Sequence, residues 1–506
     1  MAGGFFCQRG NGGPLIRPLS IAAMMALASL QVPDRALATL LGRIAQMTDR
    51  RLHPAVISLL WVAGLALLIA SPSRSLMASQ PGDISPAVAT IESMYVLEDA
   101  PLPLPPETPA ASHALDFRFG GISDLFRAET AADGTIHLWG ITDRGPNGFV
   151  EKPSRDGSSA KPLRTLPVPT FQPLLVKLAL EAPAAAGKPG SLRVVEVKPI
   201  ATADGGPASG RPAVAPPRSK PMVDPATALP LPVDPDGLDT EGLSPADDGG
   251  FWIAEEYVPS LLRLTADGRM VRRIVPIGAV LGDGDGRRAG CEVIEALPKV
   301  CLRRADNRGF EGLARSPDGS RLFTMLQSPP EPLAGAAEED AVHVPLLLLD
   351  PVKGLPLAEY RYRLGEPGEK PADLMAADGK ISALAATGND SLLVLEQSAT
   401  ASRLYQVELG AVGAPAAGTV ATVSKRLVAD LAPLAPIFNA ELNRGASGAP
   451  GKLSDLKFEG LALLAPGVVA IVNDNDFDMD AAGDAPADPP IRRTCLWVVR
   501  FAPDAP

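Results

Sequence analysis

The feature that most constrains the fold is a hairpin pattern that recurs along the chain. Most copies have a small residue before Ile or Leu, then a turn with Gly or Asn, then an apolar run with a polar end. The copies begin at Gly120 (GGISDLF), Glu241 (EGLSPADDGGFWIAEE), Glu311 (EGLARSPDGSRLFTMLQ), Ile381 (ISALAATGNDSLLVLEQ) and Glu459 (EGLALLAPGVVAIVND). Short apolar runs joined by such turns predict β-hairpins.

The spacing of the copies predicts a repeat of about seventy residues. Gly242 and Gly312 are 70 residues apart, Ala383 follows after 71 and Gly460 after a further 77. The interval from Gly121 to Gly242 is 121 residues, which leaves room for one degenerate copy and an insertion rich in Pro, Ala and Gly. Six units of this length fill a mature chain of roughly 420 residues, so we expect an all-β, six-bladed β-propeller.

Composition agrees with this class and excludes others. The 53 prolines and 48 glycines among 506 residues suit many turns and short strands. The net charge of -11 would repel nucleic acid and anionic membrane surfaces, so we expect neither as a partner.

One N-terminal segment departs from the rest. Arg50 and Arg51 precede an apolar stretch that ends near Ala70, and small and polar residues follow as far as Ala78. This order is typical of a secretory signal, so we expect residues 1–80 to be an extension with a signal peptide and residues 84–505 to be the propeller domain. Met47 is then the expected start and the product is periplasmic or secreted. The alternative is an uncleaved membrane anchor, although the stretch is shorter than the roughly 20 residues of a typical span.

In an oxidising compartment, two cysteines could close a small loop. Cys291 and Cys301 flank EVIEALPKV, and Cys495 would remain unpaired. The alternative is that the two loop cysteines are free.

Several longer motifs occur in one order along the chain. They are GGISDL, ITDRGPNG, PTFQPLLVKLAL, DTEGLSPADDGGFWIAEEY, NRGFEGLARSPDG and FEGLALLAPGVVAIVNDNDF, from Gly120 to Phe477. Together they resemble the esterase-like phytase family of exported propeller proteins. The resemblance implies a phosphate-ester hydrolase that uses calcium. It also leads us to expect a Glu-Arg pair where this chain has Glu396 and Gln397.

Acidic residues recur at two positions of the repeat, which would form two rings around a propeller axis. One ring would contain Glu241, Glu311 and Glu459, before Gly-Leu, and the other Asp143, Glu255, Glu396 and Asp474, after the strand. Clustered carboxylates repel one another unless they are protonated, paired or bridged by a cation. An oxygen-rich cluster suits calcium, which would assist the attack of water on a phosphomonoester.

These considerations assign roles to individual residues. The expected metal ligands are Asp143, Glu241, Glu255, Glu396, Glu459 and Asp474. The expected catalytic residues are Asp143, Arg144, Glu255 and Glu311, and the expected substrate-binding residues are Arg144, Lys457 and Asn475. Arg144 would grip phosphate with its guanidinium fork, and Lys457 would help as a point charge.

A structural interpretation competes with each assignment. A Glu before Gly-Leu can accept backbone N–H bonds and lock the turn, and Arg144 can pair with Asp143. In NDNDFDMD, an extended conformation would point four Asp side chains to one side, with Asp474 and Asn475 the stronger candidates for a site. GDGDGRR at 282–288 lacks the distal Glu of a calcium loop and reads better as an exposed turn.

Other hydrolase chemistries lack their motifs. The chain has no G-x-S-x-G elbow and no Arg-His phosphatase motif, and His137 lies inside an expected strand. Two functions therefore remain. One is an exported, calcium-dependent hydrolase of small phosphate esters, and the other is a non-catalytic propeller that binds a ligand or partner and has a structural calcium ion.

Overall fold

The computed structural model describes residues 89–151, 162–185, 188–214, 220–281, 291–409, 420–442, 456–479 and 493–502. The expected signal segment and GDGDGRR lie outside these residues. The chain divides into two compact units, Met1–Ile84 and Ser85–Pro506, and the fold below is that of the second. None of the described helices has the length and apolar character needed to cross a membrane.

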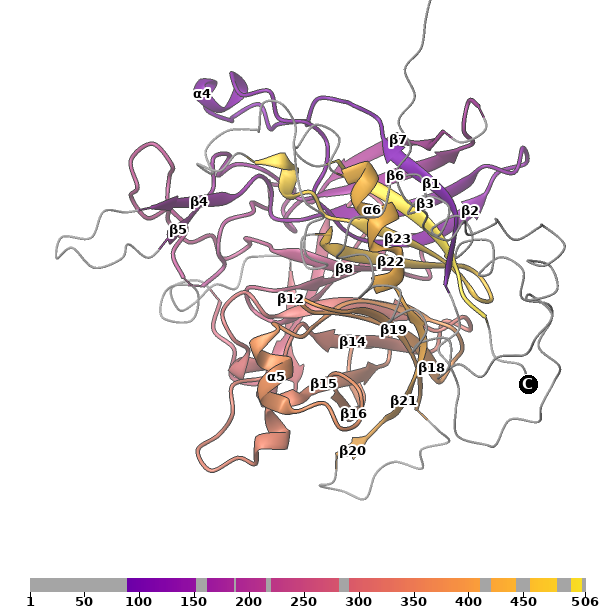
Figure 1. The fold of residues 1–506 in the computed structure, drawn as a ribbon. Coiled ribbons are helices and arrows are strands. Elements are labelled where there is room, and N and C mark those ends of the chain that lie inside the picture. Colours follow the sequence, from indigo (N-terminus) through magenta and orange to yellow (C-terminus); the bar gives the residue numbers. More distant parts are fainter. Residues whose placement is uncertain are drawn as a thin grey trace, which may run out of the picture. The chain divides into compact units, whose positions relative to one another are not determined.

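Strands are the main regular elements of the described residues, and they form four-stranded antiparallel units (Figure 1). The first unit is β2 (Ile122–Thr130), β3 (Ile136–Thr142), β6 (Leu174–Glu181) and β7 (Gly190–Pro199). The second is β8 (Thr240–Pro245), β9 (Phe251–Glu255), β10 (Ser260–Leu264) and β11 (Met270–Pro276). The third is β13 (Phe310–Arg315), β14 (Leu322–Leu326), β15 (His343–Leu349) and β16 (Pro356–Arg363).

Two more units complete the set. The fourth is β17 (Lys380–Ala386), β18 (Ser391–Gln397), β19 (Ser402–Glu408) and β21 (Ser424–Asp430). The fifth is β22 (Phe458–Ala465), β23 (Val468–Asn473), β24 (Cys495–Arg500) and β1 (Thr90–Leu97). Edge strands β12 (Glu292–Leu297) and β20 (Ala421–Thr422) and the hairpin of β4 (Gly148–Glu151) and β5 (Pro162–Thr165) are additions.

Helices are short and connect the strands. The described α-helices are α4 (Ala110–His113), α5 (Pro371–Ala376) and α6 (Ala435–Leu442), and the described 3-10 helices are η1 (Lys299–Arg303), η2 (Glu338–Val342), η3 (Ala432–Leu434) and η5 (Asp476–Asp478). In η5, Asp476, Phe477 and Asp478 have positive φ angles. The described part of NDNDFDMD, at 473–479, is therefore not the extended strand that would align its Asp side chains.

The sheets form a closed, propeller-like ring. The first strands of the units, β2, β8, β13, β17 and β22, each contact the next, and β22 returns to β2. β1 closes the last unit by pairing antiparallel with β24, and it also pairs with β7 of the first unit. We find five such units and no sixth among the described residues. Among the described residues, the long interval before Gly242 holds the outer strands β6 and β7 and irregular chain at 200–214 and 220–239.

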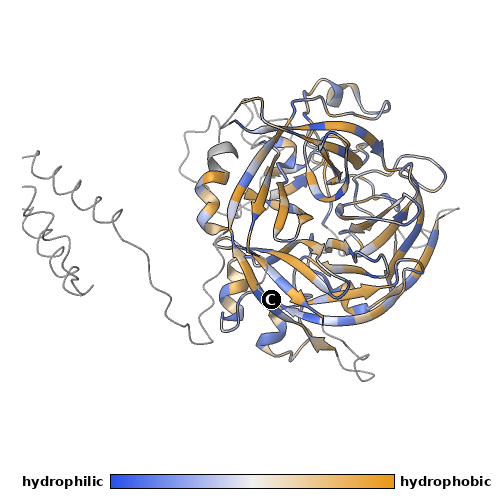
Figure 2. Ribbon diagram, turned by 90° about the vertical axis from the view of Figure 1, so that its right-hand side faces the viewer, coloured by the Kyte–Doolittle hydropathy of each residue, from blue (hydrophilic) through white to orange (hydrophobic). Residues whose placement is uncertain are grey.

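The hydrophobic cores lie between neighbouring sheets. One core joins the first and second units through Ile141, Leu175 and Ile253, and another joins the second and third through Trp252 and Phe323. Because a strand in such a stack is covered on two faces, the second strands read as continuous apolar runs. Figure 2 shows hydrophobic residues along many of the strands of the fold.

The glycine of each Glu-Gly-Leu motif permits close approach of the first strands. A Cβ on Gly242 would lie 2.7 Å from the Cβ of Leu313, and one on Gly312 would lie 2.4 Å from the Cγ of Leu384. In β2 the pairing register places Asp124 at the corresponding position. Its carboxylate accepts the backbone N–H of Leu243 at 2.8 Å and that of Leu461 at 3.4 Å, so it ties β2 to both neighbours.

Cysteine pairing can also be read from the fold. Cys291 and Cys301 are both free thiols in the structure. Cys301 is buried in the core of the second and third units, while Cys291 is only partly buried. Of the two alternatives for the loop cysteines, the structure shows free thiols.

Candidate functional site

The candidate site lies at one end of the ring, where the first strand of each unit begins and the second strand ends. Antiparallel pairing brings these two points together, as in the pairs Thr240 with Glu255 and Phe458 with Asn473. Polar residues just inside the first strands and just after the second strands therefore converge. We call this end of the ring the site end.

Three carboxylates from three first strands meet at the site end. Glu241 of β8, Glu311 of β13 and Glu459 of β22 each place a carboxylate oxygen within 4.8 Å of the other two. All three side chains are buried, and neither oxygen of Glu311 accepts a hydrogen bond of normal geometry from a described residue, although the nearby Gln327 side chain acts to lower its pKa. Lys380, at the start of β17, partly offsets their charge by pairing with Glu459 at 3.5 Å.

A second group of carboxylates adjoins the first. Asp143, Asp239 and Glu241 also have oxygens within 4.8 Å of one another, so Glu241 belongs to both groups. Burial, with the neighbouring carboxylates, raises the pKa of Glu241 and of Asp239 well above the ordinary range. Burial and the negative charge of Glu459 also raise the pKa of Glu311 well above its ordinary range. The site end thus has an excess of carboxyl groups that are costly to ionise together.

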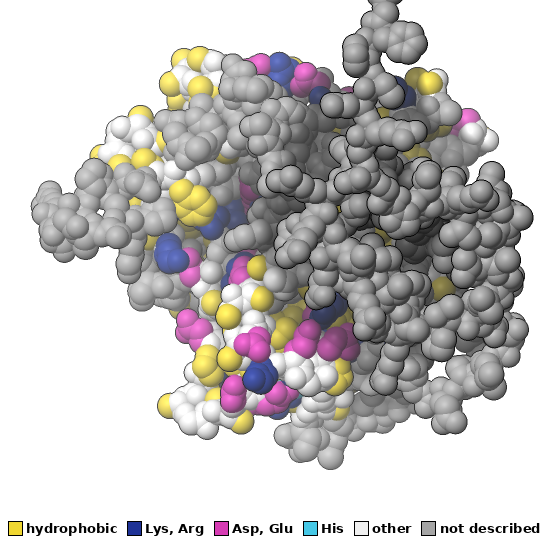
Figure 3. All heavy atoms as spheres, viewed as in Figure 1, with side chains coloured by type: hydrophobic (Ala, Val, Ile, Leu, Met, Phe, Trp, Pro, Cys, Tyr) yellow, Lys and Arg dark blue, Asp and Glu magenta, His cyan; other side chains and the backbone are white. Residues whose placement is uncertain are grey.

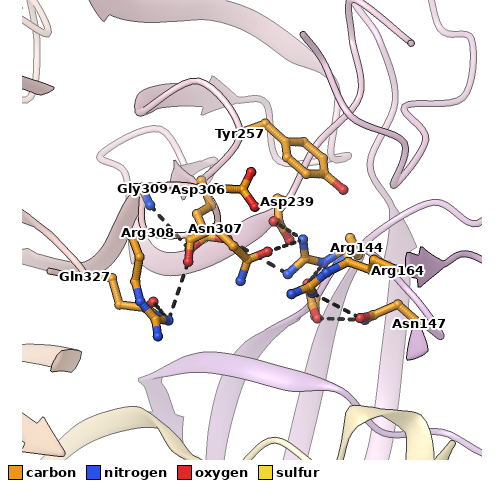
Figure 4. Close-up of polar contacts among 12 residues, drawn as sticks. Arg144, Asn147, Arg164, Asp239, Tyr257, Asp306, Asn307, Arg308, Gly309 and Gln327 are labelled. Atoms are coloured by element: carbon orange, nitrogen blue, oxygen red, sulfur yellow. Dashed lines mark hydrogen bonds and ion pairs between the residues drawn. The ribbon is translucent and has the colours of Figure 1, made fainter. Parts of the chain in front are cut away.

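Arg144 adjoins this second group, and Figure 4 shows its side chain beside Asp239. Its guanidinium pairs with Asp239 at 2.5 Å and with Asp143 at 3.2 Å, and it donates to Asn307 at 2.9 Å. Burial acts to raise the pKa of Asp143, but Arg144 and other neighbours lower it below its ordinary value. Arg144 is only 3% exposed, so its first role is to hold these carboxylates in place.

The basic and amide residues of the fifth unit are also engaged. The Lys457 ammonium lies 2.8 Å from Asp474 and pairs with Asp476 as well. Burial raises the pKa of Asp474 to about 8 in spite of that pairing. Asn475 accepts the backbone N–H of Gly121 at 2.9 Å, which joins the fifth unit to the start of the first.

Two of the expected ligands lie in separate networks. Glu255 pairs with buried Arg273 at 2.9 Å and accepts the backbone N–H groups of Tyr257, Val258 and Asp239. Glu396 accepts the Gly365 N–H at 2.8 Å and is bonded to Lys425 and Tyr362. The structure does not bring either carboxylate into the cluster at the site end.

A one-residue shift in register explains this difference. The backbone N–H groups of Asp143, Glu256, Gln327 and Asp474 donate to equivalent carbonyls, those of Gly121, Asp239, Gly309 and Lys457. Glu256 therefore corresponds to Asp143, and Glu255 is one residue earlier. Ile381 likewise pairs with Glu396, which places Gln397 at the corresponding position. Because successive side chains of a strand point to opposite faces, a shift of one residue moves a side chain out of the site.

Sequence reasoning also missed residues that the structure adds to the site. Asp239 directly precedes the Thr-Glu-Gly-Leu motif, and Glu256 lies 3.9 Å from Arg144. Arg164 comes from the β4–β5 hairpin and lies near Arg144 and Asn147 in Figure 4. The acidic side chains could have been found from their positions beside the motifs. Arg164 has no such signal, because only the fold places its hairpin at the site end.

Comparisons with known proteins agree with the motifs. Residues 118–477 match the phytase-like family, which is described as "Esterase-like activity of phytase". An uncharacterised secreted protein of Arthroderma benhamiae is 32% identical over 103 residues, 18% of this chain and 20% of the relative. The match thus spans about a fifth of that relative's length.

Solved structures resemble the fold only weakly. The PQQ-bound aldose sugar dehydrogenase of Streptomyces coelicolor is 11% identical, with a TM-score of 0.29 over 83% of this chain and 100% of that one. A gluconolactonase of Xanthomonas campestris is 12% identical, with a TM-score of 0.27 over 82% and 98% of the two chains. Such scores support no statement about activity. The family match, by contrast, covers most of the second unit, and this chain belongs to the phytase-like family.

Proposed function

We propose that the protein hydrolyses phosphate monoesters at the site end, with a calcium ion held by the clustered carboxylates. The observation that carries this proposal is Glu311. Its carboxylate is buried, neither of its oxygens accepts a hydrogen bond from the described part of the chain, and it lies against the carboxylates of Glu241 and Glu459. Such an arrangement is costly to a folded protein unless a cation or protons compensate it.

The donor set fits calcium. Calcium takes six to eight oxygen ligands, and the cluster offers carboxylate oxygens from three strands that the ring holds in place. No sulfur or imidazole ligand accompanies them in the described cluster, which favours a hard cation over zinc. A bound calcium ion would supply a positive charge that attracts a phosphate oxygen and lowers the pKa of a bound water.

The chain's own residues would position and tune this cluster. Glu241, Glu311 and Glu459 would provide the central oxygens, and Asp143 would remain ionised beside them because Arg144 lowers its pKa. Lys457, whose side chain is 25% exposed, would place a positive charge beside Asp474. Glu255 would act indirectly, since it accepts the N–H of Asp239 at 3.3 Å and so fixes the start of β8.

The test is phosphate release by the purified mature protein, with and without a chelator. We expect release from an aryl phosphate to require calcium and to fall at least tenfold in Glu311→Gln. Glu338→Gln is the matched control, because Glu338 is exposed on η2. Release that survives both the chelator and Glu311→Gln would refute the proposed chemistry.

A non-catalytic binding function is the second candidate, and one observation favours it. Arg144 and Lys457, the cations expected to grip phosphate, are both committed to internal ion pairs. If calcium raises the stability of the protein but no ester in a phosphate and carboxylate panel is turned over, this candidate replaces the first.

We also propose export to the periplasm or the medium. The basic and apolar segment at residues 50–78 and the secreted relative support it. Fractionation of cells that express the full chain, with the mature N-terminus sequenced, would distinguish export with cleavage from a retained anchor.

A further inference from the structure

One basic side chain beside the carboxylates, Arg164, forms no ion pair within the described part of the chain. Arg144, Lys380 and Lys457 each pair with at least one carboxylate. Arg164, by contrast, has no ion pair to any described carboxylate. Its one hydrogen bond to a side chain is a long one, from Nη1 to the Oδ1 of Asn147 at 3.3 Å. Its guanidinium is thus available to an anionic ligand.

Arg164 is also connected to the carboxylate cluster. Asn147, which accepts from Arg164, donates through its Nδ2 to Asp143 at 3.4 Å. Figure 4 shows the guanidinium of Arg164 close to that of Arg144. Burial and the positive charge of Arg144 lower the pKa of Arg164. An anion bound beside Arg164 would relieve this repulsion between like charges.

An exposed aromatic ring lies directly beside this guanidinium. Phe149 pairs with Arg164 across the β4–β5 hairpin, and the guanidinium lies 5.2 Å from the centre of its ring. Phe149 is 51% exposed, which is unusual for so large an apolar side chain. Figure 3 shows hydrophobic and Lys or Arg side chains together in the region of this hairpin. The hairpin therefore offers one anion-binding group and one flat apolar surface.

The charge at the site end restricts the number of phosphates that a ligand can carry. Seven described carboxylates gather there: Asp143, Asp239, Glu241, Glu256, Glu311, Glu459 and Asp474. Even with one divalent ion bound, an ester with several phosphates would place most of them against carboxylates. A single phosphate can be met by the ion and Arg164.

From these observations we infer that Phe149 of β4 and Arg164 of β5 recognise the substrate, and that they select monoesters with a single phosphate and a flat, apolar alcohol group. Arg164 binds the phosphate as a planar fork, and Phe149 packs against the organic group. A densely phosphorylated polyol is a poor ligand on this basis. The inference rests on the proposed phosphomonoesterase site.

The test measures binding rather than turnover, so it can be decided even if hydrolysis is not observed. Phenylphosphonate, methylphosphonate and inositol hexakisphosphate are titrated calorimetrically into the calcium-loaded full chain. We expect phenylphosphonate to bind most tightly. Arg164→Gln should weaken its binding about tenfold or more, because a charge-assisted bidentate contact is lost. The affinity of Arg164→Lys for phenylphosphonate should lie between those of the wild type and Arg164→Gln.

Phe149→Ala should weaken the binding of phenylphosphonate but leave the binding of methylphosphonate nearly unchanged. Arg193→Gln is the control for a lost surface arginine, because Arg193 pairs with Glu181 on the outer strand β7. Equal binding of phenylphosphonate by Arg164→Gln and the wild type overturns the inference, and so does tighter binding of the hexakisphosphate. If the wild type hydrolyses no phosphate ester but these binding differences are observed, the hydrolase proposal is refuted and the inference about ligand recognition stands.

Discussion

Replacing Glu311 by Gln should stabilise the protein in the absence of divalent ions and destabilise it relative to the wild type in calcium. At pH 8 the wild type must either bury the Glu311 charge or keep the group protonated far above its ordinary pKa. Both cost free energy. The substituted glutamine would be a neutral group of the same shape that can donate to the neighbouring carboxylates of Glu241 and Glu459.

The size of the effect follows from the burial of Glu311. A buried polar group without a partner costs about 1–3 kcal/mol, and more when it is charged. With about 2.1 cal/mol/K of unfolding entropy per residue, the unit Ser85–Pro506 has an unfolding entropy of about 0.9 kcal/mol/K. The expected rise in Tm without metal is therefore about 1–3 °C. Calcium at a hundred times its Kd should raise the free energy of unfolding of the wild type by about 2.7 kcal/mol, or about 3 °C.

The assay is differential scanning calorimetry of wild type, Glu311→Gln and the exposed control Glu338→Gln, each in chelator and in calcium. We expect the order of Tm between wild type and Glu311→Gln to reverse on adding calcium, while Glu338→Gln follows the wild type. An identical calcium response in Glu311→Gln would show that Glu311 is not part of an ion site. A lower Tm for that variant in chelator would show that its carboxylate already has a partner.

Two further predictions concern other carboxyl groups. Because the pKa of Asp474 is about 8 when folded and about 3.9 when unfolded, its contribution to stability is fully present below about pH 4 and is lost as pH rises through 8. In chelator, the Tm of the wild type should therefore fall as pH rises across this range, and the Tm of Asp474→Asn should fall less steeply. Equal slopes of Tm against pH would contradict the raised pKa of Asp474. Glu255→Gln should cost about 3–5 kcal/mol in denaturant unfolding, because buried Arg273 loses its carboxylate. Calcium titration of that variant should give nearly the wild-type affinity, and loss of calcium binding without loss of stability would place Glu255 at the ion instead.

Much of the site followed from motif position. Glu241, Glu311 and Glu459 share one place in the repeat, and the structure brings them together. The site residues at the ends of the second strands were harder to predict, because the end of an apolar run does not reveal the register in which the strands pair. A difference of one residue decides that Glu256, and not Glu255, lies toward Arg144.

By itself, the sequence determined the local properties of this protein: short apolar strands, tight turns, glycines where strands approach closely, and carboxylates at repeated positions. These depend on neighbouring residues, so they can be read along the chain. The tertiary structure decided what depends on distant residues. It closes the ring by pairing β1 with β24, arranges the described strands in five units, and brings Arg164 to the carboxylates. No local pattern encodes such contacts, because they arise only when the whole ring has assembled.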